Sequence, residues 1–264
     1  MKILLATILV SLLMIGCSRD GEILKSDTET FEPKLVSPIR FSNFVLSELG
    51  PERDLDSLFD VPISIGEGRG QSYEFMRLRS DDPDSYIRTE TAREYLDARA
   101  RGAMPMTTYD ITMNSWFTES VPVLVFLRDS IASEGSLMFD DLMDLSVDVI
   151  PWTGSEERIQ IEGDTASGLT LRDYAEKNLI KIIPRESPHE IGFQKGSQEV
   201  VVKELARGDH DHDGYEDCLI STATYYIGGS GRSYSNHLVT RTPEMPVMKI
   251  DHFVVPFTRA TDDR

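Results

Sequence analysis

The most constraining feature of the sequence is an acidic run of nine residues, Asp209-His210-Asp211-His212-Asp213-Gly214-Tyr215-Glu216-Asp217. Aspartates stand at its first, third, fifth and ninth places, and a glycine stands at the sixth. Oxygen ligands at this spacing, with a glycine where the chain turns sharply, are typical of loops that wrap around a calcium ion. We expect the ligands to be four carboxylates and one backbone carbonyl, from Asp209, Asp211, Asp213, Asp217 and Tyr215. The alternative is a solvated acidic turn that binds nothing.

The segments on either side of this loop, 199–205 and 218–227, are rich in β-branched and aromatic residues. That composition predicts two strands joined by the loop. An EF-hand is excluded because its twelfth place requires a bidentate glutamate, and Ile220 stands there. His210 and His212 alternate with the aspartates, so we expect them to point away from the ion as exposed loop side chains. Zinc or copper binding by these two imidazoles is the alternative.

Residues 208–220 resemble the Gly-Asp-x-(Asn/Asp)-x-Asp-Gly-x-x-Asp loop of FG-GAP and VCBS-type extracellular repeats, which continues into three apolar residues. The resemblance covers about thirteen of the 264 residues. Those families carry many copies and build β-propellers, whereas this chain has one copy and no other internal repeat. The resemblance therefore implies a metal-binding role for the loop and does not imply a propeller.

The N-terminus has the pattern of a lipoprotein signal. Lys2 precedes a mostly apolar run over residues 3–16, which is short for a bilayer span but fits the core of a signal peptide. Met14-Ile15-Gly16-Cys17 resembles the bacterial lipobox, which implies cleavage before Cys17, lipidation of that cysteine and a membrane anchor. A serine after the cysteine implies a place in the bacterial cell envelope, at the outer membrane and facing the periplasm. An ordinary secretory signal cleaved nearby is the alternative.

Composition limits the partners of the chain. Forty-five acidic residues against 27 lysines and arginines give a net charge of −18, which argues against nucleic acid and against electrostatic docking on anionic lipid. With Cys17 lipidated, Cys218 is left without a disulfide partner, and we expect it to be a buried thiol. Composition does not exclude a protein or glycan partner.

Strand patterns dominate the second half of the chain, and no βαβ repeat is sustained. We therefore predict an α+β fold with a mainly antiparallel sheet, a few short helices and the calcium loop between two C-terminal strands. Strands are expected at 107–113, 121–127, 179–184, 190–194, 199–206, 218–227, 236–241 and 246–254. A hairpin is expected over 61–79, and helices are expected over 41–60, 84–101, 140–145 and 170–178. The predicted organisation is a signal peptide (1–16), a flexible tether (17–40), an α+β lobe (41–130), a β-rich lobe (131–258) and a frayed tail (259–264).

One further segment carries candidate chemistry. Residues 228–237 form a polar, glycine-rich connection between two predicted strands, in which Arg232 could grip an anion and His237 could act as a general base. The chain lacks the Gly-x-Ser-x-Gly, His-Glu-x-x-His and phosphate-loop motifs of common enzymes. A non-catalytic, calcium-stabilised envelope lipoprotein is therefore the favoured reading. The alternatives are an envelope hydrolase that uses the 228–237 loop, and a partner-binding or inhibitor module.

Overall fold

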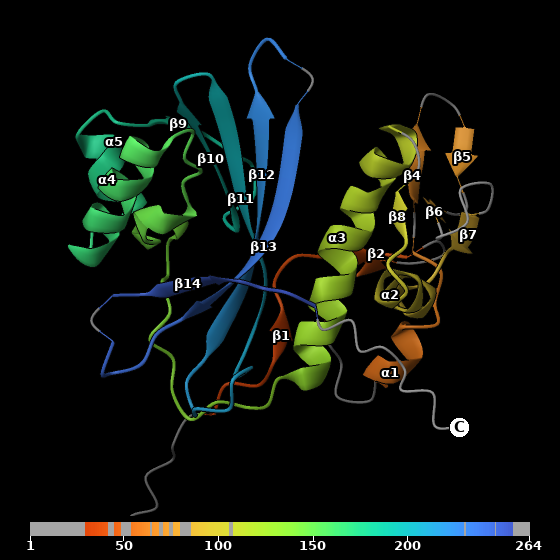
Figure 1. Cartoon of the computed structure of the whole chain (residues 1–264). Coiled ribbons are helices and arrows are strands. Elements are labelled where there is room, and N and C mark those ends of the chain that lie inside the picture. The colour runs from red at the N-terminus through yellow and green to blue at the C-terminus, as the bar shows by residue number, and fades with distance from the viewer. Residues whose placement is uncertain are drawn as a thin grey trace, which may run out of the picture.

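One antiparallel sheet forms the centre of the protein (Figure 1). The computed structural model describes residues 30–41, 45–48, 54–63, 65–68, 71–73, 76–79, 86–105, 108–229, 231–245 and 247–255. The strand order is β14-β13-β12-β11-β10-β9, and β1 pairs with one end of β11. These strands are β1 (Lys34–Leu35), β9 (Lys181–Ile183), β10 (Glu190–Lys195), β11 (Gln198–Gly208), β12 (Asp217–Tyr226), β13 (Arg232–Thr240) and β14 (Lys249–His252). The predicted α+β class and the placing of the acidic loop between two C-terminal strands are confirmed.

The two central strands, β11 and β12, are long because their side chains are buried on both faces. Val200, Val202 and Ile220 point into one hydrophobic cluster, while Leu205 and Leu219 point into another on the opposite face. A bulge at Leu205 shifts the register between β11 and β12. A sheet covered on both sides favours the β-branched runs from which these strands were predicted.

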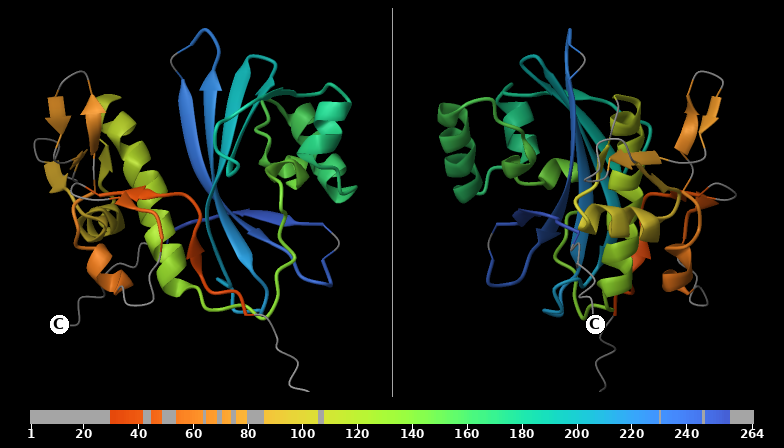
Figure 2. Two further views of the ribbon diagram at one scale, coloured as in Figure 1. Left: turned by 180° about the vertical axis from the view of Figure 1, so that it is seen from behind. Right: turned by 45° about the vertical axis from the view of Figure 1, so that its right-hand side comes forward.

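Helices cover both faces of this sheet (Figure 2). On one side, the long helix α3 (Thr108–Asp129) lies between the sheet and the smaller N-terminal elements. On the other side lie α4 (Ser155–Ala166), α5 (Leu171–Glu176) and the short 3-10 turns η1 (Leu142–Asp144) and η2 (Val147–Val149). Among the described residues, no helix combines the length and the apolar character needed to cross a bilayer.

The strands predicted at 107–113 and 121–127 are wrong, because residues 108–113 and 121–127 belong to α3. The helix has neighbours on two sides, so the residues from Val123 to Leu127 are all buried. A helix that is apolar all round loses the 3.6-residue periodicity that distinguishes it from a buried strand. Pro122 lies inside the helix and gives no helical signal either.

The N-terminal elements are short and only partly as expected. The hairpin predicted over 61–79 is confirmed in part, by β4 (Ile65–Gly68) and β5 (Gln71–Tyr73), whereas β6 (Met76–Arg79) pairs with two further strands. These are β7 (Tyr86–Thr89) and β8 (Met104–Pro105). The helix predicted over 84–101 is α2 (Ala92–Ala100), which begins later because Thr91 and Glu94 form its capping box.

The helix predicted over 41–60 is wrong over most of its length. The structure has α1 (Leu55–Leu58) there, and β3 (Val45–Leu46) pairs with β2 (Ile39–Arg40). The expected helix at 170–178 is confirmed by α5, whose capping box joins Thr170 to Asp173. Helix α4 was missed because its only buried side chain is Ile161, so its sequence shows no apolar stripe.

The predicted tether over 17–40 is wrong in its last part. Strand β1 pairs with β11, and Leu35 and Ile39 are buried in the cluster that contains α3. Packing also crosses the predicted lobe boundary near residue 130, since Leu205 and Leu219 join that cluster. The signal peptide, Cys17 and the tail 259–264 lie outside the described residues.

Candidate metal centre

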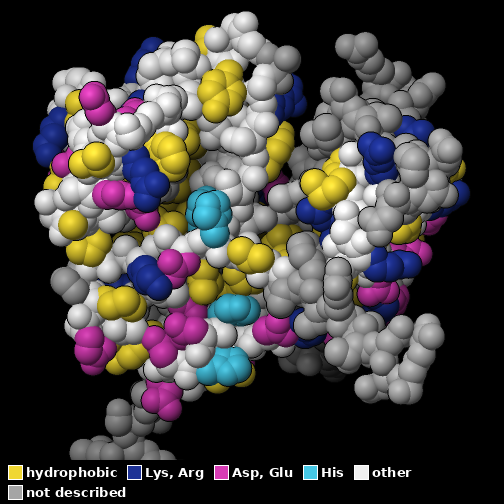
Figure 3. Space-filling view, in the orientation of Figure 1, with side chains coloured by type: hydrophobic (Ala, Val, Ile, Leu, Met, Phe, Trp, Pro, Cys, Tyr) yellow, Lys and Arg dark blue, Asp and Glu magenta, His cyan; other side chains and the backbone are white. Residues whose placement is uncertain are grey.

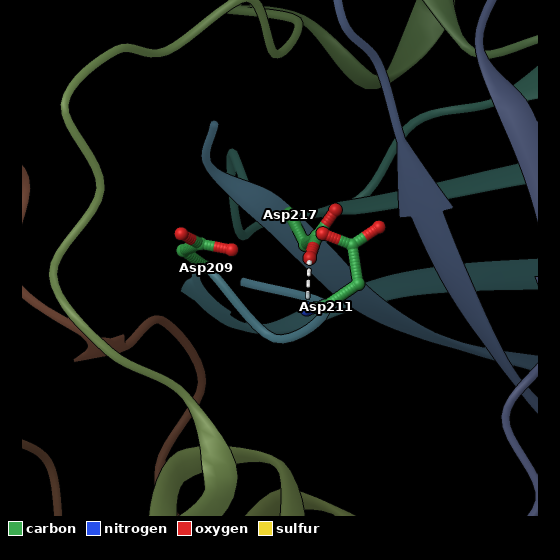
Figure 4. A group of neighbouring side chains, drawn as sticks. All are labelled: Asp209, Asp211 and Asp217. Carbon is green, nitrogen blue, oxygen red and sulfur yellow. Dashed lines mark hydrogen bonds between the residues drawn. The ribbon is translucent and has the colours of Figure 1, made fainter. Parts of the chain in front are cut away.

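The acidic loop connects β11 to β12 at one end of the sheet. The carboxylates of Asp209, Asp211 and Asp217 each offer an oxygen, and these oxygens lie within 4.8 Å of one another (Figure 4). Asp209 is only 1% exposed and Asp217 only 2%, whereas Asp211 faces solvent. Two buried carboxylates and one accessible carboxylate give a site that a cation can enter from one side.

Backbone N–H groups of the loop hold the two buried carboxylates in place. Asp217 Oδ2 accepts from the amides of His210 and Asp211 at 2.9 and 3.3 Å. Asp209 accepts from the amides of Asp213 and Gly214 at 3.1 and 2.9 Å. The loop is therefore closed around its own aspartates, as expected of short aspartate-rich turns.

Two residues of the loop have left-handed backbone. Gly214 has φ +92°, which confirms the expected sharp turn at the sixth place, where a Cβ would be strained. His212 has φ +64°, a conformation that is uncommon for residues other than glycine and asparagine. These two reversals turn the amides of the loop inward.

Burial and crowding of like charges raise the pKa of two carboxyls of the loop, those of Asp211 and Asp217. Burial, followed by the nearby charges of Asp211 and Asp213, raises the pKa of Asp217 to about 7. Burial and the charges of Asp213 and Asp209 also raise the pKa of Asp211. Asp211 contributes to raising the pKa of the exposed Lys249 of β14, so one surface lysine acts on the accessible side of the site. The pKa of Asp217 is raised all the same, so the buried part of the centre is a concentration of negative charge.

A segment that follows α3 braces the loop from outside. Ile131 and Asp209 exchange two backbone hydrogen bonds, and the Glu134 amide donates to the Gly214 carbonyl at 2.8 Å. The Glu216 amide donates to the Gly135 carbonyl, also at 2.8 Å. A Cβ at Gly135 would lie 3.3 Å from the ring of Tyr215, so the two segments are in close contact.

A buried ionic network lies beside the loop, and no pattern in the sequence predicts it. Arg207 pairs with Glu204 and reaches Glu216 at 3.3 Å, and Lys34 of β1 lies 3.6 Å from the same carboxylate. The Ser136 hydroxyl donates to Glu216 at 2.7 Å. Glu216 is 1% exposed, and the Arg207 guanidinium and the Lys34 ammonium compensate its charge.

The predicted ligands are only partly brought together. The structure gathers Asp209, Asp211 and Asp217, whereas Asp213 lies in the same loop outside this group. Asp213 Oδ1 accepts from the Tyr215 amide at 2.8 Å, which caps the turn. The chemistry of the three gathered side chains, all carboxylate oxygens, fits a hard divalent cation.

The two histidines of the loop point away from the carboxylates, as expected, but only one is exposed. His210 packs between Phe126 and Phe253, with ring centroids 5.1 and 5.2 Å apart. Burial lowers the pKa of His210. His212 is exposed, and its Nε2 lies 2.9 Å from the Asp129 carbonyl. Since the two rings have separate partners, they do not form a common metal site.

The predicted ligand-binding loop 228–237 is shorter in the structure, because β13 begins at Arg232. Arg232 lies over the ring of Tyr225 at 5.5 Å. His237 stacks on His252, and burial and that neighbour lower the pKa of His237 to about 4. Residues five apart on one strand face opposite sides of the sheet, so Arg232 and His237 do not converge on a ligand.

Comparison with known proteins adds no relative. No family model, curated protein or solved structure matches the chain. The candidate centre therefore depends on the geometry of its own residues.

Proposed function

We propose that this protein binds one calcium ion in the loop between β11 and β12, and that the ion stabilises the C-terminal β region without taking part in catalysis. The observation that carries the proposal is the Asp217 carboxylate, which is 2% exposed and lies beside two further carboxylates. Burying uncompensated charge is costly, and a divalent cation removes that cost.

The proposed coordination uses the side chains of Asp209, Asp211 and Asp217. Asp213 and the carbonyl of Tyr215 are proposed as additional ligands, because they hold the fifth and seventh places of the loop. Calcium takes six to eight oxygens, so water would supply the rest. The ion would draw together a loop whose backbone already bonds to the segment after α3.

We propose a cell-envelope location for this activity. The support is the signal-like run over residues 3–16 and the lipobox-like sequence that ends at Cys17. A lipid on Cys17 would anchor the protein to a membrane, in the favoured reading the outer membrane facing the periplasm. In cells, Cys17→Ser should move the protein from the membrane fraction to the soluble fraction. Unchanged partitioning would contradict the anchor and leave the calcium proposal untouched.

Thermal unfolding with calcium and with a chelator tests the calcium proposal. A ligand that binds only the folded state at 100 times its Kd adds about 2.7 kcal/mol. For a chain of this size that corresponds to a Tm increase of roughly 5–10 °C. Asp211→Asn should abolish the increase, because Asp211 is exposed and its replacement leaves the core intact. Asp251→Asn, an exposed aspartate of β14, is the matched control.

Asp213→Ala tests the finer assignment. If Asp213 is a ligand, calorimetry should show weaker calcium binding by this variant than by the Asp251→Asn control. Equal melting of the unmodified protein with calcium and with chelator, together with no heat of binding, would overturn the proposed function.

The two alternatives differ in their support. The hydrolase hypothesis needs Arg232 and His237 to meet at one site, and their places on β13 do not allow it. A partner-binding or inhibitor module, with a protein or glycan partner, stays a prediction, which recovery of one dominant partner in a pull-down would support.

A further inference from the structure

A second site, independent of the acidic loop, lies where β13 and β14 pair. His237 and His252 stand directly opposite each other in the register of these antiparallel strands. Their rings lie 4.8 Å apart at an angle of 26°. Residues directly opposite in such a pair have fixed backbones about 4.5–5.5 Å apart, so the two imidazoles are held as neighbours by the fold.

The hydrogen bonds around His237 leave one of its nitrogens free for a ligand. The Thr222 hydroxyl donates to Ser235 Oγ at 3.5 Å, and Nε2 of His237 lies 3.2 Å from the same hydroxyl. In the Nε2–H tautomer of His237, this nitrogen donates to the Thr222 oxygen and the lone pair of the ring is on Nδ1. A bond of this kind on the other ring nitrogen is the usual support of a metal-binding histidine.

The second imidazole is accessible. His252 is exposed, whereas His237 is partly buried. Figure 3 shows histidine side chains reaching the surface on this face of the molecule, with acidic side chains nearby. Two nitrogens bound to one ion at about 2.0–2.1 Å lie at most about 4 Å apart. The ring of His252 is exposed, so it can rotate about its side-chain bonds towards an ion held by His237.

We propose that His237 and His252 form a two-histidine site for a borderline transition-metal ion, Cu²⁺ or Zn²⁺. Imidazole nitrogen suits these ions and does not suit calcium, so the site and the acidic loop would select different metals. Among the described residues, no third histidine, cysteine or carboxylate joins the pair within ligand distance. The remaining positions on the ion are therefore open to water or to an external ligand, and copper should bind more tightly than zinc.

Titration of the full chain with CuCl₂ and with ZnCl₂ in excess calcium tests this site. Calorimetry should give one ion per chain, and the copper spectrum should show coupling to two nitrogens. His252→Asn and His237→Asn should each weaken binding by at least about tenfold. His189→Gln, which removes an exposed imidazole from the turn before β10, should leave the affinity for copper and zinc unchanged.

If His237→Asn, at the partly buried position, fails to fold, His252→Asn at the exposed position decides the outcome. Affinity retained in His252→Asn would overturn the site, and so would the absence of saturable binding of copper and zinc by the unmodified protein. Excess calcium keeps the acidic loop from contributing, and the comparison between histidine variants holds whether or not that loop binds calcium. The two proposals can therefore fail separately.

Discussion

Ile131 and Asp209 exchange two backbone hydrogen bonds, at 2.9 and 3.1 Å, and so tie the segment after α3 to the first aspartate of the acidic loop. Phe126, near the end of α3, also stacks on His210 of the loop. The loop therefore lies at a junction between the long helix and the central sheet. An ion bound there would act on both.

Calcium should slow hydrogen exchange at this junction. We expect the amides of Ile131, Glu134 and Glu216 to become more protected on addition of calcium, because their bonds can open only when the loop loosens. Exchange measured by mass spectrometry with calcium and with chelator checks this. The Leu179 amide, bonded to Tyr174 at the end of α5, is an internal control that should not respond. Calcium-independent exchange at all three amides would contradict the coupling.

Asp217→Asn should stabilise the calcium-free protein and abolish its response to calcium. The pKa of Asp217 is about 7 in the folded protein and 3.8 is its ordinary value. The folded state thus binds more protons than the unfolded state between these values. Stability from this group is present at low pH and is lost as pH rises towards and above 7. At pH 8 the substitution should raise the free energy of unfolding by on the order of 2–4 kcal/mol.

Urea unfolding of the two proteins at several pH values, in chelator, measures this effect. The gain from Asp217→Asn should grow between about pH 4 and pH 8 and should disappear when calcium is added to the unmodified protein. Asp251→Asn serves again as the control, since its carboxylate is exposed. A loss of stability at pH 8 in Asp217→Asn would show that the charged carboxylate is already compensated.

Arg207→Met should destabilise the protein strongly. Arg207 is the shared partner of Glu204 and Glu216, whose side chains are almost completely buried. Removing the guanidinium takes an ion-pair partner from two buried carboxylates. Breaking a buried ion pair lowers the free energy of unfolding by about 3–5 kcal/mol. Arg158→Gln removes an exposed ion pair with Glu162 and should cost only a few tenths of a kcal/mol. The two urea midpoints should therefore differ clearly, and similar midpoints would contradict a structural role for the network.

Local signals in the sequence account for what was predicted correctly. The acidic loop could be predicted because all its aspartates lie within nine residues, and their spacing alone brings three carboxylates together. The C-terminal strands are readable because their β-branched runs end at turn residues. The capping boxes of α2 and α5 are also local, because each joins residues only three positions apart.

Contacts between distant residues account for what was missed. Lys34 meets Glu216 only because β1 pairs with β11, so no sequence window contains the ionic network. The apolar run over 121–127 belongs to α3, which is enclosed on two sides. The run alone does not show whether it is a buried helix or a buried strand. His237 was recognised as a candidate, but its partner His252 comes from strand pairing and was not foreseen.

His237 should make the protein sensitive to acid. Its pKa is about 4 in the folded protein, below its ordinary value of 6.5, because burial and the neighbouring His252 disfavour the charged ring. The unfolded state therefore binds more protons between these values. Stability from the neutral ring is fully present above pH 6.5 and is lost as pH falls to about 4. The free energy of unfolding should fall by on the order of 3 kcal/mol over this pH range.

Unfolding free energies between pH 7 and pH 4, in the presence of EDTA, should fall less steeply for His237→Asn than for the unmodified protein. An NMR titration of the imidazole protons gives an independent measurement, in which His237 should titrate well below the ordinary histidine pKa of 6.5. Other groups facing His237 are the hydroxyls of Thr222 and Ser235 and the ring of His252, so a second basic or acidic partner is not needed to explain the shift. An ordinary titration of His237 near pH 6.5 would mean that its ring is hydrated, and the acid sensitivity would then have to come from another group.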